Sequence, residues 1–195
     1  MEQLVDLVKS YNPNADLGLI KKAYKFAEAA HFGQKRASGD SYISHCLAIA
    51  QILAKWRLDT YSLAAGILHD TIEDGAATRE DIQKEFGETI SALVDGVTKV
   101  GQLHLRGSLE EEFVENLRQM FLAMAKDLRV VIIKLADRLH NMETLAYLPL
   151  EKQKRIAKET MEVYAPLADR LGMGETKGEL EDLAFLYLYP DDYQW

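Results

Sequence analysis

A short stretch of the chain holds most of the side chains that could do chemistry. His69 and Asp70 are followed by the acidic pair Glu73 and Asp74, in a run that is otherwise apolar from Ile67. Spacings of four residues place these side chains on adjacent faces of a helix, where three carboxylates repel one another. A shared divalent cation relieves that repulsion, so the run predicts a metal site. A His-Asp dipeptide alone is weak support, because such pairs are common in proteins.

Asp137 is a second candidate ligand. It lies in an apolar stretch that begins at Val130, and Asn141 follows one turn later on the same helical face. Two oxygen-bearing side chains therefore point the same way. An ion pair with the neighbouring Arg138 is the structural alternative for Asp137.

His45 is the third candidate position, at the start of the apolar run from Leu47 to Trp56. Its imidazole can face a pocket, and a satisfied core histidine is the alternative. Together the candidate ligands are two imidazoles and two carboxylates: His45, His69, Asp70 and Asp137. Such a mixed set suits manganese, iron or zinc, and with room for water it is typical of a catalytic site.

The elements that must position these residues are helices. Apolar residues recur at three- and four-residue spacing, and no segment indicates a sheet. We therefore expect an all-α fold, a compact multi-helix bundle around a central metal site. The expected helices cover 16–32, 45–57, 60–73, 79–86, 88–99, 109–126, 128–145, 151–170 and 175–188. Thr78 with Asp81 and Ser108 with Glu111 resemble capping boxes, residues 101–107 form a loop, and Pro166 should kink or restart its helix.

Length and composition agree with one globular domain over residues 1–195. The single cysteine, Cys46, excludes an intrachain disulfide, and we expect a cytoplasmic protein with no membrane segment and no signal peptide. The net charge of −8 argues against a nucleic-acid partner. It would also repel a polyphosphate substrate, unless a metal ion or a basic cluster reverses the field at the site.

Several motifs in the same order resemble the N-terminal hydrolase domain of the RelA/SpoT homologue family, a branch of the HD phosphohydrolases. The resemblance covers roughly residues 16–190 without a large gap. The motifs are QKRASG at 34–39, YISH at 42–45, LHDTIED at 68–74, FG at 86–87, LVDGVTK at 93–99, IKLADRLHNM at 133–142, YAPLA at 164–168 and ELEDLAF at 179–185.

This resemblance implies a role for each candidate residue. His45, His69, Asp70 and Asp137 match the metal ligands, and the ion is usually Mn²⁺, with Fe²⁺ or Zn²⁺ as alternatives. Glu73 and Asp74 match the acidic pair that positions or deprotonates the attacking water. The matched substrate contacts are Arg36 on the guanine, Ser38 as a nearby polar contact, Asn141 by the ribose and 3′-phosphates, Tyr147 in the base pocket and Lys154 on the 5′-phosphate side.

The implied activity is hydrolysis of guanosine tetra- and pentaphosphate, ppGpp and pppGpp, to GDP or GTP and pyrophosphate, which ends the stringent response. Long members of the family continue into a synthetase domain, so we expect either a small hydrolase or a piece excised from a longer protein. Departures from the family pattern are Ala37, Cys46, Glu143 and Asp169, and none of them is a predicted ligand. They put substrate affinity in doubt more than catalysis.

Two other functions stay open. The chain could be an HD phosphohydrolase of another nucleotide, or a catalytically retired domain that binds nucleotide and regulates a neighbour. The intact His69-Asp70 pair argues against retirement, and Arg36 with Asn141 favours the alarmone. For the basic residues at 152–158, a solvated helix face is the alternative to phosphate contact.

Overall fold

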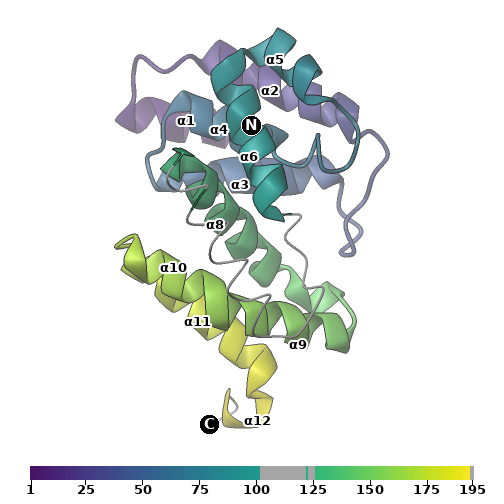
Figure 1. The fold of residues 1–195 in the computed structure, drawn as a ribbon, viewed down its shortest axis with the longest axis vertical. Coiled ribbons are helices and arrows are strands. Elements are labelled where there is room, and N and C mark those ends of the chain that lie inside the picture. Colours follow the sequence, from purple (N-terminus) through teal and green to yellow (C-terminus); the bar gives the residue numbers. More distant parts are fainter. Residues whose placement is uncertain (102–121, 123–125, 194–195) are drawn as a thin grey trace. The chain divides into compact units, whose positions relative to one another are not determined.

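The structure is a computed structural model that describes residues 1–101, 122 and 126–193. The helix expected at 109–126, its Ser108 cap and the loop expected at 101–107 lie outside these residues apart from their ends. The chain divides into two compact units (Figure 1). The first comprises Met1–Arg36 and Asp40–Lys134, and the second comprises Ala37–Gly39 and Leu135–Trp195.

Helices form both units, as the sequence predicts. In the first unit they are α1 (Glu2–Tyr11), α2 (Leu17–Ala30), α3 (Tyr42–Lys55), α4 (Thr60–Leu68), α5 (Arg79–Phe86) and α6 (Glu88–Gly101). Helix α8 (Leu128–Glu143) crosses the division between the units at Lys134. The second unit holds η1 (Leu145–Tyr147), α9 (Leu150–Glu159), η2 (Thr160–Tyr164), α10 (Ala165–Arg170), α11 (Gly174–Leu188) and α12 (Pro190–Tyr193). An isolated bridge joins Lys35 to Ser41, and the described chain has no strand.

Helix α4 is the centre of the first unit. It packs against α2, α3 and α6, and every residue from Ser62 to Leu68 is buried. A helix that is apolar on all sides needs neighbours on all sides, which is why this segment becomes the core. Asp59 begins it by accepting a hydrogen bond from the Ser62 amide at 3.0 Å.

The prediction of one helix over 60–73 is wrong at its C-terminal end, because α4 stops at Leu68. The Leu68 carbonyl accepts bonds from both the amide and the hydroxyl of Thr71, at 3.0 and 2.6 Å. These three-residue contacts replace the four-residue ladder, and Gly75 turns the chain with a φ of 70°. The acidic pair therefore lies in a compact turn rather than on a regular helix.

In the second unit, α11 packs against α9, η2 and α10. The break expected at Pro166 is confirmed: a π-helical turn, η2, precedes α10, in which Pro166 is an early residue. Proline has no amide hydrogen to continue the α-helical ladder, so the preceding turn widens.

In the first unit, the Thr78–Asp81 capping box at α5 is also confirmed.

Other boundaries differ from the expectation. Helix α3 begins at Tyr42, three residues before the expected start, and α1, η1 and α12 were not expected. The buried face of α1 consists of Leu4, Val5 and Val8, so their apolar spacing could have indicated this helix in the sequence.

Among the described residues, none of the helices is both long enough and apolar enough to cross a membrane.

Candidate metal centre

The first unit brings three of the predicted ligands together. His45 comes from the second turn of α3, while His69 and Asp70 follow the last turn of α4. The Asp70 Oδ2 atom lies 2.9 Å from His69 Nε2 and 3.7 Å from His45 Nε2. All three residues are buried, with exposed fractions of 1% for His45, 0% for His69 and 9% for Asp70. One carboxylate oxygen thus faces two imidazole nitrogens inside the protein.

The backbone of α4 sets the orientation of the His69 ring. His69 Nδ1 lies 2.9 Å from the carbonyl oxygen of Gly66, which can only accept, so Nδ1 carries the proton and donates it. In the neutral ring the lone pair is then on Nε2, which faces Asp70 Oδ2. A backbone carbonyl that fixes the tautomer in this way is typical of metal-binding histidines.

This geometry fits a divalent cation. A lone pair and a carboxylate oxygen 2.9 Å apart repel each other unless positive charge joins them, either a proton on His69 Nε2 or a metal ion. Two ligand atoms at about 2.1 Å from a cation with octahedral geometry, at a right angle to each other, lie about 3 Å apart. The donor set of imidazole nitrogen and carboxylate oxygen is also the one that manganese, iron and zinc accept.

Tyr42 contacts this centre and His31 packs on Tyr42, and neither residue was expected from the sequence. The Tyr42 hydroxyl donates a hydrogen bond of 2.6 Å to Asp70 Oδ2. The His31 ring stacks on the Tyr42 ring with centroids 4.6 Å apart. Burial, and then the nearby Asp70 carboxylate, raise the pKa of the Tyr42 phenol, so it remains a donor. Tyr42 could have been found from its spacing to His45, one turn apart on α3, whereas His31 has no comparable local signal.

The acidic pair lies at the surface beside the buried ligands. Glu73 and Asp74 are both exposed, in the turn after α4. Asp74 Oδ2 lies 3.6 Å from His31 Nδ1. Burial of its carboxyl, and then the Asp70 charge, raise the pKa of Asp74 above its usual range. Solvent can therefore reach the pair, as a role in handling water requires.

The remaining predicted residues divide between the units. Arg36 is half-buried in the first unit, with its guanidinium 5.6 Å from the centre of the Tyr42 ring. The others belong to the second unit: Ser38, Asp137, Asn141, Tyr147 and Lys154.

Within α8, Asp137 is buried, and its Oδ1 accepts a bond of 2.6 Å from Asn141 Nδ2, which confirms that the two share a face. Arg138 turns elsewhere, to Glu159 at 3.1 Å. The two predicted contacts for the base and the 5′-phosphate are at the surface. Tyr147 on η1 is 61% exposed, and Lys154 on α9 is exposed.

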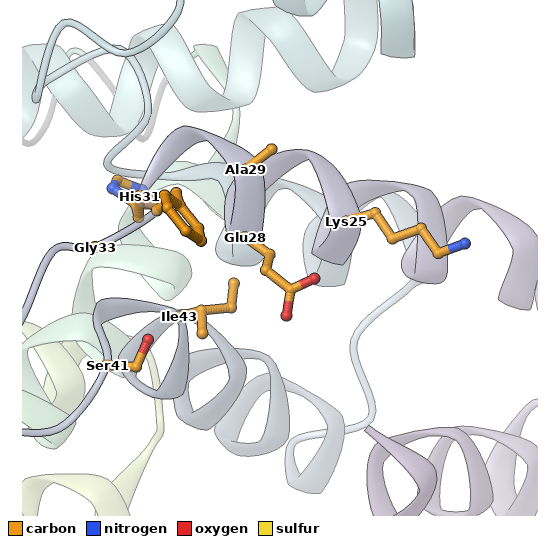
Figure 2. A pocket seen from close by; sticks show the side chains of 8 residues that line it. Lys25, Glu28, Ala29, His31, Gly33, Ser41 and Ile43 are labelled. Atoms are coloured by element: carbon orange, nitrogen blue, oxygen red, sulfur yellow. The ribbon is translucent and has the colours of Figure 1, made fainter.

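A pocket of about 440 Å³ opens next to this centre, between the end of α2 and the start of α3 (Figure 2). None of the predicted site residues lines it. Its walls are formed by Lys25, Glu28, Ala29, His31, Phe32, Gly33, Ser41 and Ile43. Figure 2 shows the nitrogen atoms of His31 on the side away from Lys25 and Glu28. His31 thus both lines this pocket and stacks on the Tyr42 ring.

Comparison with known proteins identifies the family. The family model for the HD domain matches residues 23–174, a span that includes all the predicted ligands. The chain belongs to the HD domain family.

The relatives confirm the resemblance to the RelA/SpoT homologues. The HD domain is 50% identical to a GTP pyrophosphokinase of Myxococcus xanthus over 188 residues, which are 95% of this chain and 25% of that protein. It is also 50% identical to a GTP pyrophosphokinase of Streptomyces coelicolor, over 99% of this chain and 23% of that protein. The chain thus spans about a quarter of the length of these curated relatives.

Among solved structures, the HD domain resembles one described as a metazoan ortholog of SpoT that hydrolyses ppGpp. The TM-score is 0.61 and the identity is 26%, and the match covers 90% of this chain and 96% of that one.

Proposed function

We propose that this HD domain is a metal-dependent 3′-pyrophosphohydrolase of the guanosine alarmones ppGpp and pppGpp. One observation carries the proposal: Asp70 Oδ2 faces His69 Nε2 at 2.9 Å, with His45 beside them. This arrangement requires a cation to offset the repulsion between the two atoms. The structural relative described as hydrolysing ppGpp supports this choice of reaction. The names of the curated relatives describe the opposite, synthetic reaction, so the direction of the chemistry is part of the proposal.

Four residues would hold the cation. His45, His69 and Asp137 are buried, and each offers one ligand atom of a suitable kind, to which we add Asp70. We infer that the ion is Mn²⁺. Fe²⁺ and Zn²⁺ are alternatives, because the donor set of imidazoles and carboxylates accepts all three ions. When bound, such an ion lowers the pKa of water and offsets charge on a phosphoryl oxygen.

The chain's own residues would supply the remaining steps. Glu73, with Asp74, takes a proton from the attacking water as the general base. The water oxygen bonds to the phosphorus attached to the 3′-oxygen, and the bond from that phosphorus to the 3′-oxygen breaks. The 3′-oxygen takes up a proton from solvent, and the products are pyrophosphate and GDP or GTP. Arg36 packs on the guanine, and Asn141 contacts the ribose and the 3′-phosphates. Ser38, Tyr147 and Lys154 complete the proposed substrate contacts.

In this proposal residues 1–195 act as one hydrolase domain that works in the cytoplasm. Because the curated relatives are about four times longer, we further propose that a synthetase domain follows it in the full-length protein. The partner is a small nucleotide rather than a nucleic acid, in keeping with the net charge of −8.

A panel of nucleotides tests the reaction. The protein is incubated with Mn²⁺ and ppGpp, pppGpp, GTP, ATP or NADPH, and pyrophosphate and orthophosphate are measured separately. We expect pyrophosphate from ppGpp and pppGpp alone. Turnover of another member of the panel would show a different nucleotide hydrolase, and absence of turnover with nucleotide still bound would show a retired domain.

Two substitutions separate metal binding from proton transfer. Asp70→Ala removes a ligand, so we expect loss of both the bound metal and turnover. Glu73→Gln keeps the shape of the side chain but not its basicity, so metal content should persist while kcat falls by about 10²- to 10⁴-fold. Metal analysis and steady-state kinetics of each variant distinguish loss of the metal from loss of the base. Joint loss of metal and activity in Glu73→Gln would make Glu73 a ligand instead of a base.

A further inference from the structure

The hydroxyl of Tyr42 contacts the same oxygen atom of Asp70 that faces both imidazoles. Its donated bond to Asp70 Oδ2 is 2.6 Å long and joins the first residue of α3 to the turn after α4, 28 residues later. Hydrogen bonds from neutral donors to a carboxylate are short and strong at this distance. The carboxylate is therefore tied to α3 at the side where it meets His45 and His69.

The Tyr42 ring is itself held in place. His31, which is 2% exposed, stacks on it with an interplanar angle of 28°, and the His45 ring meets its edge with centroids 5.7 Å apart. Tyr42 and His45 are one turn apart on α3, so one helical face carries both the phenol and an imidazole. His31 Nδ1 is oriented by Gln34 Oε1 at 2.9 Å, which fixes the plane of the stack.

The geometry points to Tyr42 as a positioning residue of the metal centre, which aims the Asp70 carboxylate at the cation. This inference rests on the proposed function, because it takes Asp70 as a metal ligand. Carboxylate ligands commonly need such a hydrogen bond from outside the ligand set, and its loss costs about 10- to 100-fold in metal affinity. Without the phenol, Asp70 loses one of the contacts that limit rotation about its side-chain bonds, and any freedom gained before the ion binds must be lost on binding.

Another tyrosine of the first unit provides a matched control. The Tyr11 hydroxyl donates a bond of 2.8 Å to the carbonyl oxygen of Leu58, 47 residues away. Like Tyr42, it ties two distant segments with one phenolic hydrogen bond, but its acceptor is backbone and not a proposed ligand. Tyr11→Phe and Tyr42→Phe therefore remove the same atom from the same unit.

The experiment titrates each purified protein with manganese(II) chloride alone and follows the electron paramagnetic resonance signal of the free ion. Thermal unfolding and circular dichroism of the metal-free proteins run in parallel. We expect Tyr42→Phe to raise the Kd for Mn²⁺ by about tenfold or more, and Tyr11→Phe to leave it unchanged. At saturating Mn²⁺, turnover of ppGpp by Tyr42→Phe should recover most of the wild-type kcat.

The results separate this inference from the proposed function. An unchanged Kd in Tyr42→Phe overturns the positioning role, and so does an equal weakening in both tyrosine variants, which would indicate a general loss of stability. Wild-type protein that binds Mn²⁺ but releases no pyrophosphate overturns the proposed function and leaves the inference to be decided by the Kd values. Wild-type protein that binds none of Mn²⁺, Fe²⁺ and Zn²⁺ overturns both.

Discussion

At the scale of single residues, a neighbouring polar group orients two of the proposed ligands. His69 is oriented by the carbonyl of Gly66 in its own helix, and Asp70 by the phenol of Tyr42 from another helix. The proposed base Glu73 has a different kind of neighbour. A Cβ atom at Gly101 would lie 2.8 Å from Glu73 Oε2 and 3.1 Å from Lys134 Nζ, so a glycine with no side chain leaves room for both groups.

We therefore predict that Gly101→Ala lowers activity more than stability. The added methyl group must displace the Glu73 carboxylate, the far end of a flexible side chain, which costs little folding free energy. A displacement near 1 Å at a reacting group can cost up to about 10²-fold in rate, and we expect at least a tenfold loss of kcat. Steady-state kinetics and urea unfolding of the same preparation measure the two effects.

Gly96→Ala on the same helix is the control. Its Cβ would lie 2.7 Å from Val130 Cγ2, a branched side chain with little freedom to move. We expect this variant to lose about 1–3 kcal/mol of unfolding free energy while the folded fraction keeps its kcat. Equal kinetic losses in the two variants would contradict the specific role of Gly101.

At the scale of elements, the second unit depends on a cationic side chain that links α8 to the π-helical turn. The Arg138 side chain is mostly buried, pairs with Glu159 at 3.1 Å and lies over the Tyr164 ring at 4.0 Å. Burial acts to lower the pKa of Arg138, but the contacts with Tyr164 and then with the Glu159 charge outweigh burial and raise this pKa. Glu159 precedes η2 and Tyr164 is its last residue, so the two contacts lie at the two ends of this turn, just before Pro166 restarts the helix.

We predict that Arg138→Met destabilises the second unit by about 2–3 kcal/mol, because it leaves the partly buried Glu159 carboxylate without its cation and removes the contact with Tyr164. Lys158→Met is the matched control, since Lys158 pairs with Glu162 at 3.8 Å and both side chains are more than half exposed. Its effect should stay below about 0.5 kcal/mol. Urea unfolding followed by far-ultraviolet circular dichroism gives both values, and similar losses would refute the argument.

At the scale of the whole molecule, charge and metal binding are linked. The chain carries a net charge of −8, which repels a nucleotide with two pyrophosphate groups at long range. A bound divalent cation offsets part of this charge at the site. Any ligand that binds only the folded state also stabilises it, by about 2.7 kcal/mol at a concentration 100 times its Kd.

We predict that Mn²⁺ at 100 times its Kd raises the Tm of this protein by about 5–10 °C, and that a chelator reverses the shift. The shift should vanish in Asp70→Ala and persist in Asp191→Ala, which removes an exposed acid on α12. Differential scanning fluorimetry measures all three proteins. A full shift in Asp70→Ala would place the ion elsewhere.

Much of the architecture was predictable because helix formation depends on neighbours in the sequence. The bounds of α5, its capping box and the restart at Pro166 are confirmed, and all three follow from side chains within a few residues. The end of α4 was not predictable in the same way. Thr71 can bond to the Leu68 carbonyl or point outward in a continued helix, and the apolar periodicity through Ile72 favoured the helix.

By itself, the sequence determined the helical class and the candidate donors, because both depend on residue type and short-range spacing. Only the tertiary structure decided which donors meet and how they are aimed. His45 and Asp70 approach to 3.7 Å because α3 packs on α4, and Tyr42 reaches Asp70 across 28 residues of chain. Such contacts depend on the burial of an all-apolar α4 among its neighbours, a property of the folded core that no local pattern specifies.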